Sequence, residues 1–176
     1  MTRPKAHTFL HRPWWSIGQE VPGFATRRLN ETATRGRAGV LNLISAATII
    51  ILLFRPELDP VPLVGTFVVA DMLAAALFGL TPLSPTGVLG TLLTMRIAPV
   101  WKPFAPKRFA WLLGASLGVT CLTMRALHAP TSWLIGVVGA CFTLTWFESV
   151  IGFCVGCFLY GRLRECEDCE LPYLRT

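Results

Sequence analysis

Apolar residues in this chain are gathered into long runs that contain almost no charge. Four runs are long enough to form helices that cross a lipid bilayer: 38–54, 61–80, 109–127 and 131–160. About 20 apolar residues are needed to cross a hydrocarbon core of about 30 Å, so the first run, with 17 residues, lies at the lower limit. The pattern predicts an all-α integral membrane protein, built as a bundle of about four transmembrane helices.

Turn-forming residues separate these runs. Residues 55–60 hold two prolines and mixed charges, which favour a short turn. In the next break Ser84 precedes Pro85, and this order is typical of a helix start with serine at the N-cap and proline at the first helical position. The segment 85–101 is apolar but short, and an arginine and a proline interrupt it. It predicts an interfacial or re-entrant helix rather than another crossing.

The last run has no proline and no glycine-rich break. It therefore predicts one continuous helix over residues 131–160, which Thr131 or Ser132 could cap. Its 30 residues would extend for about 45 Å at about 1.5 Å per residue. Because this length exceeds the thickness of the hydrocarbon, we expect the helix to tilt or to project from the membrane.

These runs divide the chain into three parts. Residues 1–37 form a basic N-terminal segment, residues 38–160 a four-helix membrane domain, and residues 161–176 a polar tail. The N-terminal segment carries seven Lys and Arg residues and no apolar stretch with the length of a signal-peptide core. We expect this segment to stay in the cytoplasm and to remain in the mature protein.

The composition supports a membrane protein and gives the basic residues a topological meaning. Mean hydropathy is +0.55, only 15% of residues are charged, and the formal net charge is +6. A basic stripe on a soluble fold would suggest nucleic-acid binding, but here the basic residues flank apolar runs. We expect the lipid bilayer as a partner, and no nucleic acid.

The distribution of Lys and Arg predicts the orientation. Fourteen of the sixteen lie in the N-terminal segment, in residues 96–108 and in residues 162–175, which four crossings place on one side. Since basic residues are enriched on the cytoplasmic side, both termini are predicted to be cytoplasmic in a multi-pass protein of the cell's inner (plasma) membrane.

Cysteines are the first candidates for chemistry. Four of the six form two Cys-x-x-Cys pairs, Cys154 with Cys157 and Cys166 with Cys169, separated by eight residues. Such a pair suits dithiol exchange or metal ligation because its two sulfurs can converge. On a continuous helix Cys154 and Cys157 would share one face at a separation that permits a disulfide. Cys121 and Cys141 are interpreted as packing residues.

Two considerations limit this chemistry. On a helix that runs to residue 160, Cys154 and Cys157 would lie near the C-terminus, whereas a helix N-terminus is what lowers the pKa of a reactive thiol. The tail pair, Cys166 and Cys169, lies among acidic residues with a spacing that suits zinc poorly, so it is only a weak metal candidate. We expect no cofactor and no bound metal.

Two acidic residues fall within the apolar runs, and such groups usually face a partner or a cavity. Asp71 lies in the second run and Glu148 in the fourth. Each could make a packing hydrogen bond or could handle protons. On a continuous helix Glu148 would not face the thiols of Cys154 and Cys157. Arg125, near the outer end of the third run, is expected to extend to the interface.

The end of the fourth run, FESVIGFCVGCFLY over residues 147–160, resembles a bacterial membrane family known as domain of unknown function 4395. In that family a glutamate precedes a Gly-Phe-Cys-x-Gly-Cys stretch that ends near a tyrosine. The segments SPTG at 84–87 and PKRFA at 106–110 are also similar to its central loop. The resemblance spans about residues 35–164; the family's Arg/Asn opening is echoed only loosely here, and the tail cysteine pair is an addition.

The family brings no assigned reaction, but its paired cysteines imply thiol redox or sulfur handling. On this basis Cys154 and Cys157 are the candidate redox pair, with Glu148 as a candidate for proton handling. The leading hypothesis is a membrane-embedded dithiol protein that exchanges reducing equivalents or sulfur with a thioredoxin-like or sulfur-handling protein at the cytoplasmic face. The alternatives are a noncatalytic accessory subunit of a larger membrane complex and a small transporter that uses Asp71 and Glu148. Reversible oxidation of the pair would separate the first hypothesis from the others.

Overall fold

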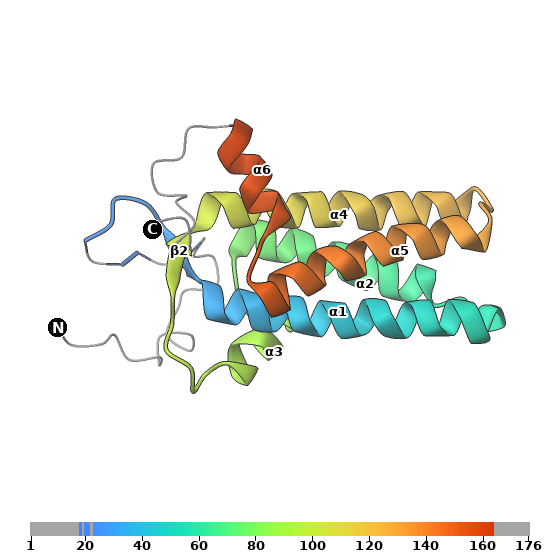
Figure 1. Cartoon of the computed structure of the whole chain (residues 1–176), viewed down its shortest axis with the longest axis horizontal. Coiled ribbons are helices and arrows are strands. Elements are labelled where there is room, and N and C mark those ends of the chain that lie inside the picture. Colours follow the sequence, from blue (N-terminus) through green and yellow to red (C-terminus); the bar gives the residue numbers. More distant parts are fainter. Residues whose placement is uncertain (1–17, 19, 22, 164–176) are drawn as a thin grey trace.

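The computed structural model describes residues 18, 20, 21 and 23–163. Its elements, drawn in Figure 1, are β1 (Arg28–Asn30), α1 (Glu31–Phe54), the 3-10 turn η2 (Pro56–Leu58), α2 (Val61–Phe78), α3 (Pro85–Leu93), β2 (Trp101–Pro103), α4 (Phe104–Ala126), α5 (Thr131–Trp146), the π-helical turn η3 (Phe147–Ile151) and α6 (Val155–Leu163).

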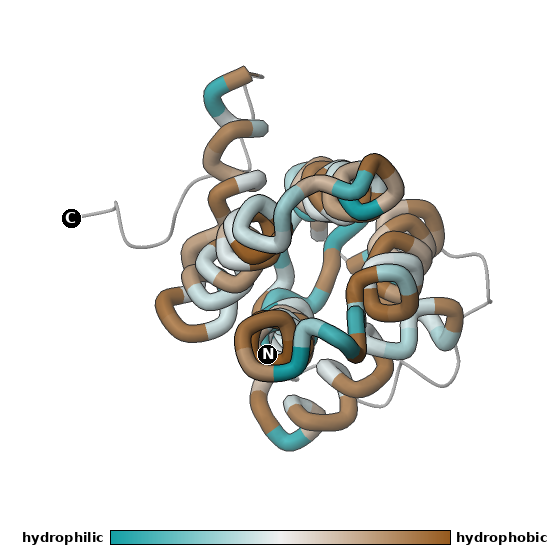
Figure 2. Tube along the Cα trace, turned by 90° about the vertical axis from the view of Figure 1, so that its right-hand side faces the viewer, coloured by the Kyte–Doolittle hydropathy of each residue, from teal (hydrophilic) through white to brown (hydrophobic). Residues whose placement is uncertain are grey.

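Four long helical segments lie side by side as a bundle. Helices α1, α2 and α4, and α5 continued by η3, are each long and apolar enough to cross a membrane. Viewed from one end, they surround a common axis and carry apolar residues on their outer sides (Figure 2). Large apolar side chains such as Leu43 and Leu63 are 71% and 80% exposed, which suits contact with lipid. The predicted all-α membrane bundle is confirmed.

Helix α3 does not cross. Its nine residues extend only about 13 Å, and it packs against α1 near one end of the bundle (Figure 1). Its predicted start is confirmed, because Ser84 Oγ accepts a hydrogen bond from the Gly87 N–H at 3.2 Å and Pro85 is the first helical residue. The predicted cap of α5 is wrong, since Pro130 holds the N-cap position and none of the described side chains caps that helix.

A short β-pair, which the hydropathy pattern did not predict, joins the starts of α1 and α4. Strands β1 and β2 are antiparallel, with Arg28 opposite Pro103. Backbone hydrogen bonds continue the pairing on either side, from the Glu31 N–H to the Val100 carbonyl at 2.7 Å and from the Phe104 N–H to the Arg27 carbonyl at 3.0 Å. The first turns of α1 and α4 are therefore held next to each other.

Both of these helices begin earlier than their apolar runs. Helix α1 begins at Glu31 instead of residue 38, and α4 begins at Phe104 instead of residue 109. The added turns contain charged residues that are buried in ion pairs, so hydropathy alone could not assign them to helices. Pro106 is tolerated in the first turn of α4 because its missing N–H would have no helical partner there.

The prediction of one continuous helix over residues 131–160 is wrong. Helix α5 ends at Trp146 and widens into η3, and the chain then turns at Gly152 before α6 begins at Val155. Gly152 has φ +78°, a left-handed conformation that favours glycine. Helix α6 points away from the direction of the bundle at its β1–β2 end (Figure 1).

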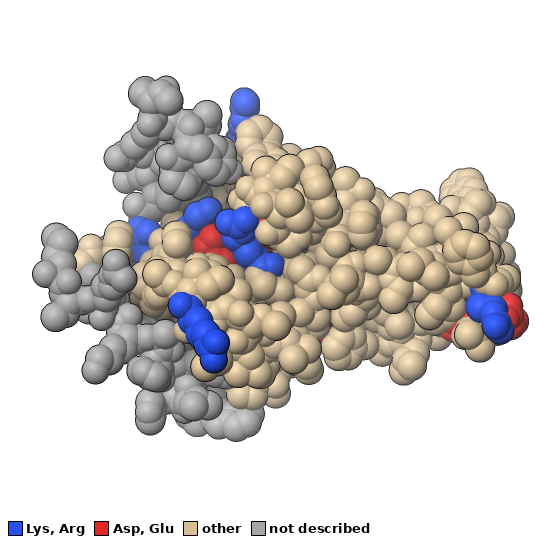
Figure 3. All heavy atoms as spheres, turned by 60° about the horizontal axis from the view of Figure 1, so that its bottom comes forward, with Lys and Arg blue, Asp and Glu red and all other residues tan. Residues whose placement is uncertain are grey.

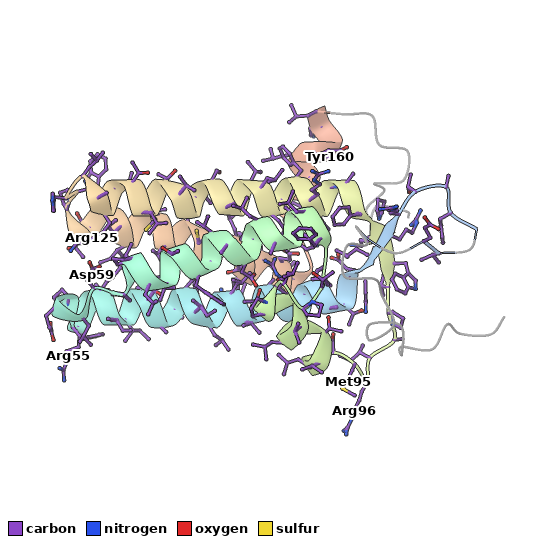
Figure 4. The ribbon with its side chains drawn as sticks, turned by 180° about the vertical axis from the view of Figure 1, so that it is seen from behind. Arg55, Asp59, Met95, Arg96, Arg125 and Tyr160 are labelled. Atoms are coloured by element: carbon purple, nitrogen blue, oxygen red, sulfur yellow. The ribbon has the colours of Figure 1, made fainter. Side chains whose placement is uncertain are left out.

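The described charges separate toward the two ends of the bundle. On the face shown in Figure 3, blue and red side chains lie at the β1–β2 end and at the opposite end, with an uncharged region between them. Figure 4 places Arg55, Asp59 and Arg125 together at that opposite end. Arg125 Nε lies 2.5 Å from Asp59 Oδ2, so this arginine pairs with an acid instead of only extending to the interface as predicted.

Candidate dithiol site

Cys154 caps the N-terminus of α6. Its carbonyl accepts the hydrogen bond of the Phe158 N–H at 3.0 Å, which closes the first turn of the helix. Its Sγ accepts a further hydrogen bond from the backbone N–H of Cys157 at 3.4 Å. This is the role that a serine or aspartate side chain plays at an N-cap, and it brings the two cysteines together across one turn.

This geometry reverses a conclusion drawn from the sequence. On a continuous helix the pair would lie near a C-terminus, but the break at Gly152 places it at the start of a new helix. A helix N-terminus carries partial positive charge, which stabilises an adjacent thiolate. The main objection to a reactive thiol at Cys154 is thereby removed. Both cysteines are free thiols in this structure.

A close contact between two helices fixes the position of the pair. The Cα of Gly156 lies against Ala110 of α4, so closely that a Cβ on residue 156 would come within 2.5 Å of the Ala110 Cβ and 2.6 Å of its Cα. Only glycine fits there without a shift of one helix. The first turn of α6 is therefore seated on α4 one turn after Lys107.

Lys107 lies at the centre of a buried ion cluster. Its side chain is only 2% exposed, and its Nζ lies 2.9 Å from Glu31 Oε2 and 2.6 Å from Glu148 Oε1. Lys102 approaches the other oxygen of Glu31 at 3.4 Å. The cluster joins α1, α4 and η3, and Thr34 adds a hydrogen bond to Glu31 at 3.2 Å. Glu148 thus has a defined cationic partner.

The surroundings shift the pKa values of the two thiols in opposite directions. The hydrogen bond from the Cys157 thiol lowers the pKa of Cys154, and the charge of Lys107 and the Cys157 N–H act in the same direction against burial and Glu148. The same bond raises the pKa of Cys157, and burial raises it further. Cys154 is therefore the first of the two to ionise, although it is buried and Cys157 is only half-buried.

Arg35 holds the turn that leads to the pair. Its guanidinium donates to the carbonyls of Ser149 at 3.3 Å and Val150 at 3.1 Å, both in η3. It also lies against Gly152, where a Cβ would meet the Arg35 Cζ at 3.2 Å. The wide turn of η3 frees backbone carbonyls, and this arginine satisfies two of them. Helix α1 thus braces the cysteine-bearing loop from one side.

A second buried cluster holds Asp71 and is separate from the thiols in its contacts. Arg37 is 1% exposed, and its Nη2 lies 2.7 Å from Asp71 Oδ2. Asp71 also accepts hydrogen bonds from Ser84 Oγ at 2.9 Å and from both the N–H and the hydroxyl of Thr86. The Arg37 guanidinium stacks over Trp111. This cluster joins α1, α2, α3 and α4. Both carboxylate oxygens of Asp71 accept two hydrogen bonds each.

The remaining candidates stand apart from the site or outside the described residues. Cys121 and Cys141 lie in the spans α4 and α5, where Cys121 packs in an apolar cluster. The tail pair Cys166 and Cys169 lies outside the part of the chain that the structure describes. Within residues 18–163 as described, no group of three or more His, Cys, Asp or Glu side chains could hold a metal ion.

Sequence reasoning missed the cations of both clusters. Lys107 was counted among the basic residues of 96–108, and Arg37 was placed in the N-terminal segment, because each lies outside the apolar runs. A usable signal was present: an acid inside an apolar run needs a cation at the same depth. Lys107 lies at the same end of the bundle as Glu148, but only the fold shows which basic residue turns inward.

Comparison with known proteins identifies a family. The model of a family described as Domain of unknown function (DUF4395) matches residues 29–165, which takes in all four spans and the Cys154–Cys157 pair. No curated protein and no solved structure matches the chain.

Proposed function

The chain belongs to the family described as Domain of unknown function (DUF4395), and from that premise we propose that it is a membrane-embedded dithiol protein. Cys154 and Cys157 exchange reducing equivalents or sulfur with a partner protein. The observation that carries the proposal is the position of Cys154 at the N-terminus of α6, with its Sγ bonded to the Cys157 N–H. A helix start, a neighbouring cation and a second thiol three residues later are what dithiol exchange requires.

The exchange proceeds in two steps. The Cys154 thiolate attacks one sulfur of a disulfide in the partner, the disulfide bond breaks, and the sulfur that leaves takes up a proton as a thiol. Cys157 then loses its proton and attacks the Cys154 sulfur of the mixed disulfide. A Cys154–Cys157 disulfide forms and the second partner thiol is released, so two electrons and two protons pass from this protein to its partner. The reverse sequence reduces the pair.

The proposed site lies on the cytoplasmic side of the cell's inner (plasma) membrane. Fourteen of the sixteen Lys and Arg residues belong to segments that four crossings place on one side, and such segments are usually cytoplasmic. The pair follows the last span at that end of the bundle. In the cytoplasm most thiols are kept reduced, so a soluble thioredoxin-like protein is the class of partner that suits the pair.

Thiol trapping in intact cells tests this proposal. Cells are oxidised mildly, quenched with acid, and treated with a maleimide mass tag that adds to each free thiol. Two of the six thiols should become protected together in the parent. Cys154→Ser and Cys157→Ser should each abolish the protection. Cys121→Ser and Cys141→Ser, which remove cysteines within the spans, are the matched controls and should leave it intact.

A different result would favour a different function. If Cys154 and Cys157 stay tagged under every oxidising condition, and the double serine variant grows as the parent does, the dithiol proposal is wrong. A noncatalytic accessory subunit would then be the better account, and co-purification of the protein with a larger membrane complex would support it.

A further inference from the structure

We propose that Lys107 is the positioning residue that makes Cys154 the attacking thiol, and that Glu31 and Glu148 hold its ammonium group in place. This inference rests on the proposed dithiol function and adds to it the residues that control which thiol reacts. It assigns roles to residues that do not exchange electrons. It also gives Glu148 a task other than proton transfer, namely to hold a cation beside the dithiol.

The position of Lys107 is fixed by its surroundings. Lys107 lies in the first turn of α4, and Gly156 of α6 packs on Ala110, one turn further along the same helix. The start of α6 is therefore seated over the part of α4 that carries the lysine. The ammonium group is buried, and carboxylates at 2.9 Å and 2.6 Å prevent it from extending to solvent. Lysine side chains that lack such partners usually turn outward.

Burial gives this charge its effect. Between exposed groups, water and salt screen the attraction of a cation for a thiolate, but buried groups are screened much less. Cys154 and Lys107 are both buried. Lys107 contributes to the ionisation of both cysteines, and Glu148 opposes it at both. The hydrogen bond from Cys157 to Cys154 then decides which of the two sulfurs carries the negative charge.

Among the described residues, the titratable groups that act on Cys154 are Lys107 from α4, Glu148 from η3 and Cys157 from α6 itself. Glu31 from α1 acts through its ion pair with Lys107. Arg35 of α1 is engaged by the carbonyls of Ser149 and Val150. Lys107 and Glu148 therefore have opposite effects on the same thiolate. Removing one should slow the reaction of Cys154, and removing the other should accelerate it.

The experiment measures how fast iodoacetamide alkylates Cys154 as a function of pH. It uses the purified full-length protein in detergent, with Cys121, Cys141, Cys166 and Cys169 changed to Ser, and mass spectrometry identifies the labelled residue. Lys107→Gln should slow alkylation at pH 7 by roughly tenfold, because loss of the cation raises the pKa of Cys154 and leaves less of it as the reactive thiolate. Glu148→Gln should accelerate it, because Glu31 still holds the Lys107 ammonium group at 2.9 Å while the negative charge that opposes the thiolate is removed. Lys107→Arg should react at nearly the parent rate.

Lys102→Gln is the matched control. Lys102 also lies near Glu31, with its Nζ 3.4 Å from Oε1, but its side chain is 28% exposed and it is not among the groups that shift the pKa of Cys154. Lys102→Gln should leave the alkylation profile unchanged. If Lys107→Gln does not fold, the comparison of Glu148→Gln with the parent and with Lys107→Arg still decides the question, since acceleration supports the inference and an unchanged profile overturns it.

The result is independent of whether a redox partner exists. Equal profiles for the parent, Lys107→Gln and Glu148→Gln, or shifts of the same sign for both variants, would overturn the role of Lys107 even if the disulfide couple forms in cells. Opposite shifts in a protein whose pair never oxidises in cells would uphold the electrostatic arrangement and reject the dithiol function.

Discussion

At the residue scale, two cations buried at the beginnings of transmembrane helices organise this protein. Arg37 and Lys107 are each almost fully buried, and each is paired with at least one carboxylate. A charge withdrawn from water is tolerated only when its partners are well placed, and removal of one partner leaves the other uncompensated. Among the described residues, the Arg37 cluster has no cysteine in its contacts, whereas the Lys107 cluster adjoins the dithiol. We assign stability to the first and reactivity to the second.

The stability role predicts the effect of Asp71→Asn. This change leaves the Arg37 charge buried without its carboxylate, and a broken buried pair of this kind costs about 3–5 kcal/mol. Thermal aggregation in detergent should therefore begin at a clearly lower temperature. The control is Arg55→Gln, which removes a side chain that is 71% exposed and lies 3.6 Å from Glu57. That change should have no measurable effect, and an equal loss in both variants would contradict the assignment.

The residues that carry the proposed chemistry were found from the sequence, but their supports were not. Cys154, Cys157 and Glu148 stand out because of spacing, depth and resemblance. Lys107 is 41 positions from its partner Glu148, and no local pattern links the two. A long-range ion pair depends on which helices are neighbours and on how they rotate. A single sequence does not contain that information in a form that spacing can reveal.

At the element scale, the decisive feature is the end of α5. Glycine is common inside transmembrane helices, so Gly152 did not distinguish a helix break from an ordinary position in the run. The structure shows the left-handed turn there, and this turn converts a predicted helix C-terminus into a new N-terminus at Cys154. Because the turn at Gly152 was not predicted, Cys154 was expected beside the partial negative charge of a helix C-terminus, whereas it lies beside the partial positive charge of an N-terminus.

Two glycines of α6 provide a matched pair of variants. Gly156→Ala would bring a methyl group within 2.5 Å of the Ala110 Cβ, so α6 must move away from α4 and Cys154 from Lys107. We expect slower alkylation of Cys154 at pH 7. Gly161→Ala meets nothing within 4 Å and should leave alkylation unchanged while it slightly stabilises the helix. Iodoacetamide kinetics on the two variants would check this, and identical rates would show that the contact does not position the thiol.

At the scale of the whole molecule, hydropathy alone was sufficient for the membrane bundle. Long uncharged runs must be helical in a bilayer because each backbone polar group needs a partner within the chain. The same physics could not predict the β1–β2 pair or the early starts of α1 and α4, because paired charges and short strands leave no trace in hydropathy. These features form the polar end of the bundle, where the proposed site lies.

The distribution of basic residues predicts the topology of the whole chain. Reporter domains fused before Met1 and after Thr176 should both give a cytoplasmic signal, and a reporter inserted at residue 57, between α1 and α2, should give a signal from the opposite side. A periplasmic signal from either terminus would contradict this orientation. It would also place the dithiol in an oxidising compartment and change the class of its partner.

An equilibrium redox titration of Cys154 and Cys157 tests the central claim most directly. The purified parent protein is equilibrated in buffers of reduced and oxidised dithiothreitol or glutathione, trapped with acid and a mass tag, and mapped by mass spectrometry. We predict a single two-electron transition in which a disulfide joins Cys154 to Cys157, with Cys121 and Cys141 reduced throughout. A pair that stays reduced across the whole range of potentials, or an oxidised state that joins other cysteines, would contradict the account.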